Sequence, residues 1–253
     1  MTDYFRFKHF IIWQNECAMK VGTDGVLLSA WACSLLGDNH REILDKSATS
    51  LLDIGTGTGF IAMQIAAEHS NINAVAIDID ERSIRQARQN VEIANLNDRV
   101  DVRVLDFSHT EYIKDVLDGR FDIIISNPPF YEEETHNRNN REDSAKHTTR
   151  LSFEQLIAGI DASLSINGVA YLILPYSAIF KLIAICAERC LYLTHRCDVF
   201  TTTRAMQHQP QRVLLAFQRT IRPTKTSQLV LNNADGTATP AFKQLTQNVY
   251  EWH

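Results

Sequence analysis

The segment SNPPF at residues 126–130 combines residue types that can hold a planar nitrogen group. An exocyclic amine on an aromatic base is a poor nucleophile, because its lone pair is delocalised into the ring. Two hydrogen-bond acceptors on its N–H bonds favour the pyramidal geometry that frees this lone pair. The side-chain carbonyl of Asn127 can be one acceptor, and the backbone carbonyl of Pro128 can be the other. Pro129 keeps Pro128 out of the helical region, and Phe130 can stack on a flat acceptor.

The same segment has a purely structural interpretation, in which two prolines terminate a loop. Taken alone, the motif leaves both interpretations open. A glycine-rich turn farther upstream favours the functional one. No general base is obvious near the motif, and none is strictly required, because the proton becomes acidic once the nitrogen is alkylated.

The upstream turn is DIGTGTGF at residues 53–60, which follows an apolar strand-like run and opens a helix. The spacing of Asp53, Gly55, Gly57 and Gly59 differs from the G-x-G-x-x-G of dinucleotide-binding turns. A carboxylate at the strand end suits a ligand that carries an ammonium group, and alternate glycines let the backbone approach that ligand closely. A tight turn that binds nothing is the alternative, but packing alone does not explain three alternate glycines.

Acidic residues end the next two predicted strands. Asp78 lies about twenty residues beyond the glycines, where nucleotide-binding sheets of this kind place the acceptor for ribose hydroxyls. Asp80 competes for this role, but its position favours capping the following helix. Asp106, followed by Phe107, ends the third strand, and the alternative for Asp106 is an exposed loop acid. The carboxyl ends of parallel strands are where open α/β sheets bind ligands.

Hydrophobic periodicity predicts strands that alternate with helices, which is typical of a parallel sheet covered on both faces. The last two strands of the core have no helix between them and are expected to form an antiparallel pair at one sheet edge. We therefore predict an α/β fold, doubly wound and Rossmann-like, with a seven-stranded, mostly parallel sheet and an antiparallel edge strand. The predicted strands are 50–54, 74–78, 99–105, 121–126, 167–175, 191–200 and 211–219, and the predicted helices include 60–68 and 80–95.

Helix caps and turns add local expectations. Ser152 and Gln155 form a capping-box pattern at the start of a helix. The tail is predicted to form a short hairpin around residues 233–236, then a helix capped by Thr239 with Pro240 at its first position. The chain 1–253 is expected to be a single domain, with an N-terminal extension 1–49, a catalytic core 50–225 and a C-terminal tail 226–253.

The composition argues against several classes of protein. The chain has 253 residues, of which 45% are hydrophobic and 22% charged, and its formal net charge of −5 gives no whole-molecule basic field. Five cysteines without a C-x-x-C argue against a disulfide framework or a zinc site, so no metal is expected. The N-terminus lacks the apolar core of a signal peptide, and no stretch approaches the ~20 apolar residues of a membrane span. We expect a cytoplasmic protein without a membrane partner.

The glycine turn resembles motif I of class I S-adenosylmethionine-dependent methyltransferases. The N-P-P-F segment resembles the [NDS]-P-P-[YFW] motif of methyltransferases that act on planar amino or amide nitrogens. Within residues 5–31, the stretch MKVGTDGVLLSAW resembles the start of the bacterial tRNA1(Val) (adenine-37-N6)-methyltransferase family. The likeness continues through DIGTGTGF, AIDID, SNPPF and RVLLAF and covers most of the chain. It implies an enzyme that methylates N6 of an adenine in tRNA with S-adenosyl-L-methionine as cofactor.

The resemblance also implies roles for residues before the glycine turn. Lys20, Thr23 and Asp24 would lie near the methionine end of the cofactor. The alternative is that Thr23 or Asp24 caps a helix over residues 26–36.

In the same family, a carboxylate at the position of Asp106 accepts from the adenine amine of the cofactor, while the next residue packs on the ring. The resemblance thus implies catalytic residues Asn127, Pro128, Pro129 and Phe130, and cofactor-binding residues Lys20, Thr23, Asp24, Asp53, Gly55, Thr56, Gly57, Gly59, Asp78, Ile79, Asp106, Phe107 and Asn127.

The partner implied by the resemblance is tRNA. Between residues 191 and 225, six Lys or Arg residues accompany a single acid, Asp198. Such a basic strip can hold an RNA backbone, and the alternative is a solvated face on edge strands. The loop 131–150 combines a run of three glutamates, Glu132–Glu134, with basic residues and can order on substrate binding. Adenine 37 lies in a loop beside the anticodon, and unpaired loop bases are the usual targets of specific RNA readers. The expected substrate-binding residues are Tyr131, Arg204 and Arg212.

Three other classes of function are compatible with parts of the sequence. The nearest keeps the chemistry and changes the acceptor to guanine N2 of ribosomal RNA, adenine N6 of DNA or the glutamine amide of a release factor. Release-factor enzymes favour Tyr after the prolines and carry a larger helical N-terminal domain, and neither feature is present. A non-catalytic binding protein with this fold would be signalled by loss of Asn127 or the glycines, and both are intact. A nicotinamide oxidoreductase is disfavoured by the glycine spacing and the lack of an evident catalytic Tyr–Lys or His pair.

Overall fold

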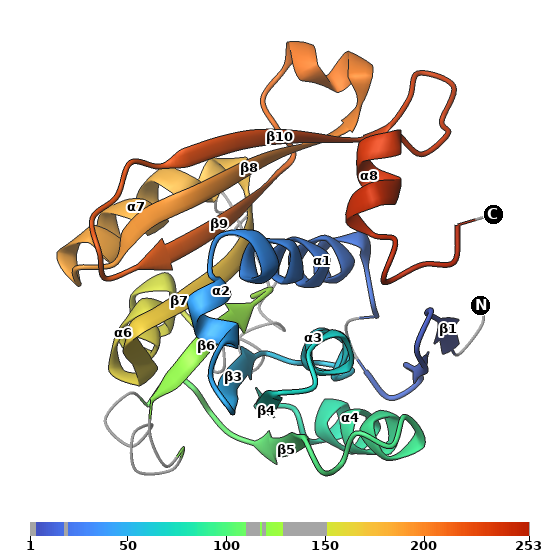
Figure 1. The fold of residues 1–253 in the computed structure, drawn as a ribbon, viewed down its shortest axis with the longest axis vertical. Helices are drawn as coiled ribbons and strands as arrows, with labels where there is room; N and C mark the ends of the chain where they lie inside the picture. The colour runs from blue at the N-terminus through green and yellow to red at the C-terminus, as the bar shows by residue number, and fades with distance from the viewer. Residues whose placement is uncertain (1–3, 18–19, 110–116, 118–119, 129–150, 253) are drawn as a thin grey trace, which may run out of the picture.

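The computed structural model describes residues 4–17, 20–109, 117, 120–128 and 151–252 (Figure 1). Strands and helices alternate over the first three quarters of the chain. No described helix is long and apolar enough to cross a membrane. The elements are β1 (Tyr4–Arg6), β2 (Ile11–Trp13), α1 (Thr23–Asp38), α2 (Arg41–Leu44), β3 (Thr49–Ile54), α3 (Phe60–Glu68), β4 (Ile72–Asp78), α4 (Glu81–Ile93), β5 (Val100–Val104), β6 (Phe121–Ser126), α6 (Phe153–Ser163), β7 (Leu164–Pro175), α7 (Ile179–Glu188), β8 (Tyr192–Thr202), β9 (Arg212–Gln218), β10 (Lys225–Asn232) and α8 (Pro240–Leu245), with short 3-10 turns η2 (Tyr176–Ala178) and η3 (Thr203–Gln207).

The central sheet has the strand order β10-β8-β9-β7-β6-β3-β4-β5 in the described part of the chain. All neighbouring strands pair in parallel except at β9, which is antiparallel to both β7 and β8. This arrangement confirms the predicted α/β, Rossmann-like fold with a mostly parallel sheet and an antiparallel strand pair. Two details of the prediction are wrong: the sheet has eight strands, and the antiparallel strand lies inside the sheet rather than at its edge.

The burial of β9 explains its interior position. Val213 to Phe217 are all buried, so both faces of this strand are covered. A continuous apolar run of this kind is typical of a strand with neighbours on both sides. The edge is instead formed by β10, whose first four residues are exposed and which pairs in parallel with β8. The predicted tail hairpin is confirmed, because a turn through Gly236 follows β10 and Asn232 and Ala238 form an antiparallel bridge across it. The prediction missed that β10, its first arm, also joins the main sheet.

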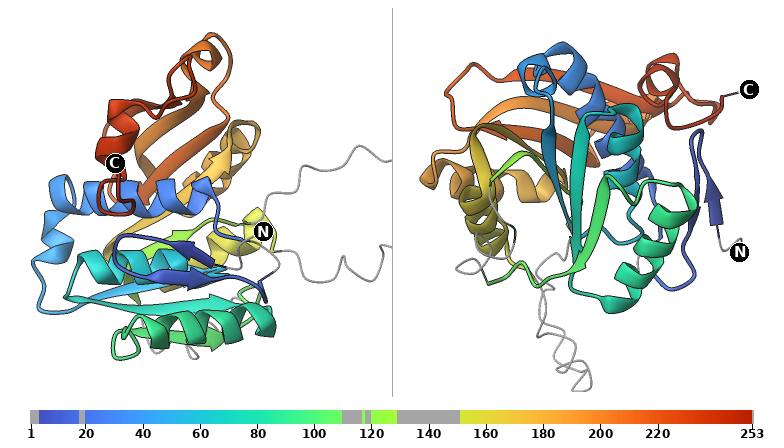
Figure 2. Two further views of the ribbon diagram at one scale, coloured as in Figure 1. Left: turned by 90° about the vertical axis from the view of Figure 1, so that its right-hand side faces the viewer. Right: turned by 60° about the horizontal axis from the view of Figure 1, so that its bottom comes forward.

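The strands divide the apolar core into two clusters, one on each face of the sheet. Leu51 and Ile125 belong to the cluster under α1, α3 and α4, whereas their neighbours Leu52 and Ile124 belong to the cluster under α6 and α7. Adjacent strand residues point to opposite faces, so a strand buried on both faces alternates between the clusters. The two groups of helices lie on opposite sides of the sheet (Figures 1 and 2).

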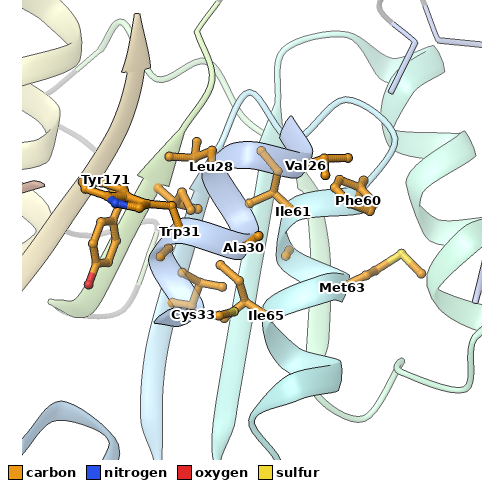
Figure 3. Packing of buried hydrophobic residues seen from close by; sticks show 14 of the residues in the cluster. Val26, Leu28, Ala30, Trp31, Cys33, Phe60, Ile61, Met63, Ile65 and Tyr171 are labelled. Carbon is orange, nitrogen blue, oxygen red and sulfur yellow. The ribbon is translucent and has the colours of Figure 1, made fainter. Parts of the chain in front are cut away.

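Helix α1 is buried over most of its circumference and packs between α3, the sheet and α8. Trp31 of α1 meets Tyr171 of β7 edge-on, with ring centroids 5.9 Å apart, and Ala30 and Ile65 lie in the same α1–α3 packing region (Figure 3). Full burial of a side chain such as Ile65 contributes on the order of 2 kcal/mol. This packing fixes the N-terminus of α1 near the carboxyl ends of the strands.

The predicted caps are confirmed for three helices. The side chain of Asp80 accepts from the backbone N–H groups of Arg82 and Ser83 and caps α4. The capping box of Ser152 and Gln155 opens α6. The hydroxyl of Thr239 likewise accepts from the backbone of α8, whose first residue is Pro240. Helix α1 differs from its prediction, because it begins at Thr23 after Gly22 and has no side-chain cap. Neither Thr23 nor Asp24 therefore has the capping role.

A cluster of polar side chains, His40, Tyr171 and His195, lies near the C-terminal end of α1. The Nδ1 atom of His40 and the hydroxyl of Tyr171 are 2.7 Å apart, and the ring of His195 lies edge-on to His40 at 5.2 Å. His40 is fully buried, and its Nε2 has no partner among the described residues. Burial, together with His195, Arg222 and Lys225, lowers the pKa of His40 to about 4 from its usual 6.5. The folded protein thus keeps His40 neutral.

This neutrality predicts a pH-dependent contribution to stability. The unfolded chain protonates His40 near pH 6.5 and the folded chain only near pH 4, so the contribution is lost as the pH falls through this window. The pKa of Asp53 is raised to about 7, so Asp53 makes the protein more stable as the pH falls. The effect of His40 must therefore be measured as the difference in stability between a His40 variant and wild type. The unfolding free energy of His40→Gln minus that of wild type should increase by about 2 kcal/mol when the pH is lowered from about 7.5 to about 5. Urea unfolding at the two pH values measures this difference.

The matched control is His9→Gln, because His9 is exposed to water in the folded chain. Its stability relative to wild type should not change with pH. An equally flat difference for His40→Gln would contradict the assignment of a neutral, buried His40.

Candidate active site

A cavity of about 430 Å³ opens at the carboxyl ends of β3, β4, β5 and β6. This volume falls within the range of about 300–1,000 Å³ found for small-molecule sites. Parallel strands deliver their carboxyl ends to the same edge of a sheet, which brings together residues that are far apart in sequence. The predicted site residues that line the cavity are Lys20, Gly55, Thr56, Gly57, Asp78, Ile79, Asp106, Phe107, Asn127 and Pro128.

The glycine turn connects β3 to α3 with three residues in the left-handed region. The φ angles of Gly55, Gly57 and Gly59 are 72°, 56° and 84°, a conformation that residues with side chains rarely adopt. No atom lies within 4 Å of a Cβ built on Gly55 or Gly57, so the backbone there faces open space. Gly59 instead packs against α4, where its Cβ would lie 3.3 Å from the Cβ of Ala87. The first two glycines face the cavity, and the third joins two helices behind it.

Asp53 supports the glycine turn from beneath and does not line the cavity. Its side chain is fully buried. Oδ2 accepts hydrogen bonds from the hydroxyl of Thr56 at 2.6 Å and from the backbone N–H of Ala62 at 3.2 Å. Oδ1 has no partner among the described residues. Burial raises the pKa of Asp53 to about 7, although the two hydrogen bonds act to lower it.

Asp78 holds the same turn from the neighbouring strand and does line the cavity. Its Oδ2 accepts from the backbone N–H of Gly57 at 3.0 Å, and its Oδ1 accepts from that of Asp80 at 2.9 Å. Burial raises the pKa of Asp78. A carboxylate oxygen can accept two hydrogen bonds, so each oxygen keeps capacity for a ligand hydroxyl.

Asp106 and Phe107 form the next part of the wall, at the end of β5. Oδ1 of Asp106 accepts from the backbone N–H of Ser108 at 2.8 Å, and hydrogen bonds from Ser108 lower the pKa of Asp106. Its position in the cavity wall favours the functional interpretation over an ordinary exposed acid. Phe107 is buried between the cavity and α6. The pair offers a flat apolar surface with an acceptor at its side.

The end of β6 supplies Asn127 and Pro128 to the lining of the same cavity. The hydroxyl of Ser126 donates to the backbone carbonyl of Ile54 at 2.8 Å, which ties the ends of β6 and β3 together. Pro129, Phe130 and Tyr131 lie outside the described residues, as does the rest of the loop through residue 150.

Four residues expected near the cofactor do not line the cavity: Asp53 and Gly59, described above, and Thr23 and Asp24. Because α1 begins at Thr23, Thr23 and Asp24 turn away from it. Thr23 lines a separate groove beside Phe7. Oδ2 of Asp24 pairs with Nε of Arg212 at 2.8 Å, so a residue expected at the cofactor and one expected at the RNA bind each other.

The basic strip is partly neutralised within the fold. Besides Arg212, Arg196 pairs with Asp198 and Arg219 pairs with Asp161. Arg204 is exposed on η3. The strip therefore presents fewer free positive charges than its composition indicates.

Sequence patterns missed the residues that fasten the N-terminal extension over the glycine turn. Asn90 of α4 is fully buried. Its Nδ2 donates to the backbone carbonyls of Trp13 and Thr58, each at 2.9 Å, and its Oδ1 accepts from the backbone N–H of Trp13 at 2.9 Å. Oε1 of Gln14 accepts from the backbone N–H of Val21 at 3.0 Å. An amide beside the apolar stripe of α4 was the only available signal.

Comparisons with known proteins agree with this geometry. The family model of the methyltransferase small domain matches residues 40–151. A tRNA1(Val) (adenine(37)-N6)-methyltransferase of Bacteroides thetaiotaomicron is 32% identical over 250 residues, which cover 98% of each chain. An enzyme of the same name from Trichodesmium erythraeum is 36% identical over 252 residues, again 98% of each chain.

The fold also resembles solved structures. That of a predicted O-methyltransferase from Agrobacterium tumefaciens matches with a TM-score of 0.65 and 17% identity, over 91% of this chain and 98% of the other. At this identity the likeness shows the Rossmann-like methyltransferase fold alone.

Phe107 gives a testable prediction through its neighbour on α6. A Cβ built on Gly159 would lie 2.6 Å from Cζ of Phe107, which is too close for any real contact. Replacing Gly by Ala in a helix normally stabilises it by about 1 kcal/mol. In Gly159→Ala, overpacking against the ring should instead destabilise the protein by about 1–3 kcal/mol, as measured by denaturant unfolding.

Gly37→Ala is the matched control, because Gly37 lies in α1 with nothing within 4 Å of its Cβ position. It should be neutral or stabilising. A Gly159→Ala variant as stable as Gly37→Ala would show that Phe107 is not held tightly in the wall.

Proposed function

Because the chain belongs to the tRNA1(Val) (adenine(37)-N6)-methyltransferase family, we propose that it methylates the exocyclic N6 amine of an adenine in tRNA, at position 37 of a valine tRNA, using S-adenosyl-L-methionine. One observation carries this proposal beyond the family. A single cavity is lined by the glycine turn, Asp78 and Asp106 and also by Asn127 and Pro128. This lining supports the proposal that a cofactor site and an acceptor clamp for a planar nitrogen share one cavity.

The described residues fit the proposed cofactor. Gly55 and Gly57 leave open backbone for its amino-acid part, and the free Oδ1 of Asp53 is a buried acceptor beneath the same turn. Asp78 would accept from the ribose hydroxyls with the lone pairs that its backbone partners leave free. Phe107 and Asp106 would contact the adenine ring and its amine. Bound there, the cofactor supplies an electrophilic methyl group.

The chain's own part in the reaction is to orient the acceptor. The side-chain carbonyl of Asn127 and the backbone carbonyl of Pro128 would accept from the two N–H bonds of the target amine. The amine nitrogen would then direct its lone pair into the cavity. Asn127 sits on the end of a strand that is tied to β3 by Ser126, so the acceptor is held before the substrate arrives. Pro129 and Phe130 keep the roles predicted for them from the sequence, as a rigid backbone and a stacking ring.

The direct test is methyl transfer from labelled S-adenosyl-L-methionine to total tRNA that lacks the modification, followed by nucleoside analysis. We expect labelled N6-methyladenosine. Cofactor binding without transfer to tRNA would overturn the proposed substrate, and assays with ribosomal RNA, DNA and release factors would then identify the acceptor.

Asn127→Ala tests the clamp in the same assay. Loss of one oriented polar group at the reacting atom should lower the rate by about two orders of magnitude or more, because these contacts act on the reacting amine. The affinity for S-adenosyl-L-methionine, measured by calorimetry, should stay largely unchanged.

Asn97→Ala makes the same chemical change at an exposed position outside the cavity and should behave as wild type. Near-wild-type turnover by Asn127→Ala would refute the clamp.

A further inference from the structure

An aromatic pair stands beyond the carboxyl end of β7. Tyr176 is half-buried and packs against the core cluster under α6 and α7, whereas Phe180 is exposed. Tyr176 follows directly after β7, and Phe180 is the second residue of α7. Their rings meet edge-on with centroids 6.1 Å apart. Phe180 is 67% exposed, which is unusual for a ring of this size. The fold gains little from such a ring, so its position calls for another explanation.

An arginine fixes one face of this aromatic pair. The guanidinium of Arg196 lies 5.7 Å from the centre of the Tyr176 ring. Asp198 holds the guanidinium through two hydrogen bonds, from Nε at 2.7 Å and from Nη2 at 3.1 Å. The Tyr176 ring is therefore positioned by a cation whose own orientation is set by an ion pair.

Tyr176 lines a groove of about 800 Å³, and Phe180 lies beside Tyr176 outside the lining of that groove. Tyr176 and Arg196 form one side, and Met206 and His208, from η3 and the residue after it, form the other. η3 belongs to the orange turn at the top of Figure 1, which connects the carboxyl end of β8 to the start of β9. The exposed Arg204 is on the same turn. The groove thus combines a flat ring, a polarisable thioether and cationic or titratable groups.

The sheet register places this groove beside the proposed reaction site. Ser126, the last residue of β6, pairs with Leu172 of β7, and β7 runs three residues farther to Pro175. Tyr176 therefore stands above the level of Asn127 on the adjacent strand. Three strand spacings, from β6 through β7 and β9 to β8, amount to roughly 15 Å. Stacked nucleotides rise about 3.4 Å each, so a few nucleotides bridge this distance.

An exposed ion pair connects the start of α7, beside Phe180, with the start of α6. Lys181, next to Phe180, pairs with Glu154 at 3.3 Å. Glu154 lies in the first turn of α6, three residues after Leu151, which lines the cavity. Both side chains are more than half exposed, so the pair shows that the starts of α6 and α7 are neighbours but contributes little stability.

We propose that Tyr176 and Phe180 form a stacking platform for an unpaired nucleotide that flanks the target adenine in the RNA loop. This inference rests on the proposed function, and it adds a subsite for the substrate. Base–aromatic stacking tolerates any base and is typical of proteins that hold single-stranded RNA. His208 and Arg204 stand where the sugar–phosphate backbone of that nucleotide passes. An RNA loop fits this surface better than an apolar protein segment, because the groove beside Tyr176 also contains His208 and the Arg196–Asp198 ion pair.

The test compares Phe180→Ala with wild type in binding an anticodon stem-loop RNA, measured by fluorescence anisotropy. Loss of one stacked ring should weaken binding about tenfold or more. It should also raise KM for tRNA more than it lowers kcat. The affinity for S-adenosyl-L-methionine and the melting temperature should not fall, since Phe180 is exposed and Ala favours a helix. Phe180→Trp, which keeps an aromatic ring at this position, should bind the stem-loop with about the affinity of wild type.

Ile221→Ala is the matched control, because Ile221 is an equally exposed apolar residue, at 73%, between β9 and β10. It should bind the stem-loop as wild type does. The paired stem without its loop should bind wild type and Phe180→Ala equally. Wild-type affinity of Phe180→Ala for the stem-loop, or an equal loss with the paired stem, would overturn the platform.

Failure of the proposed function is a separate result. In that case the wild-type enzyme would form no N6-methyladenosine in tRNA at all. A wild type that methylates tRNA, with an unaffected Phe180→Ala variant, would overturn the platform alone.

Discussion

Two carboxylates on neighbouring strands, the buried Asp53 and the half-buried Asp78, hold the glycine turn on which the site depends. Asp53 accepts from Thr56 and the first turn of α3, and Asp78 accepts from Gly57. The backbone N–H groups of Gly55 and Thr56 both donate to the carbonyl of Ile77, which fastens the turn to β4. A turn with three left-handed residues would be costly without such partners, because glycine loses more conformational entropy on folding than any other residue. The open backbone that faces the cavity is thus fixed by hydrogen bonds behind it.

The rest of the molecule keeps this arrangement in register. The parallel sheet brings the ends of four strands to one edge, and α1 and the N-terminal extension are fastened against that edge. Asn90 connects the extension, the glycine turn and α4 through three hydrogen bonds. Asp24 and Arg212 join the start of α1 to the start of β9. We therefore attribute to the extension a structural part in shaping the cavity.

Much of this could be predicted from the sequence, because the relevant signals are local. The glycine spacing, the acidic strand ends and the caps of α4, α6 and α8 follow from neighbouring residues. Long-range pairing was harder to predict. The run VLLAF in β9 indicates burial on both faces, but only the sheet shows that β10 covers the edge beyond β8. Nothing in the local sequence indicates that Asp24 forms an ion pair with Arg212, 188 residues away, instead of lining the cavity.

The most direct test of the central claim is a calorimetric titration of wild type and Asp78→Asn with S-adenosyl-L-methionine. The amide oxygen of asparagine can still accept from the backbone N–H of Gly57, but its NH2 group cannot accept, so fewer acceptors remain for the ribose hydroxyls. Loss of a charge-assisted hydrogen bond of about 1.5–3 kcal/mol corresponds to roughly tenfold to hundredfold weaker binding. We expect the affinity of Asp78→Asn for S-adenosyl-L-methionine to be lower by this factor. Equal affinity for both proteins would show that the carboxylate behind the glycine turn does not organise the cofactor site.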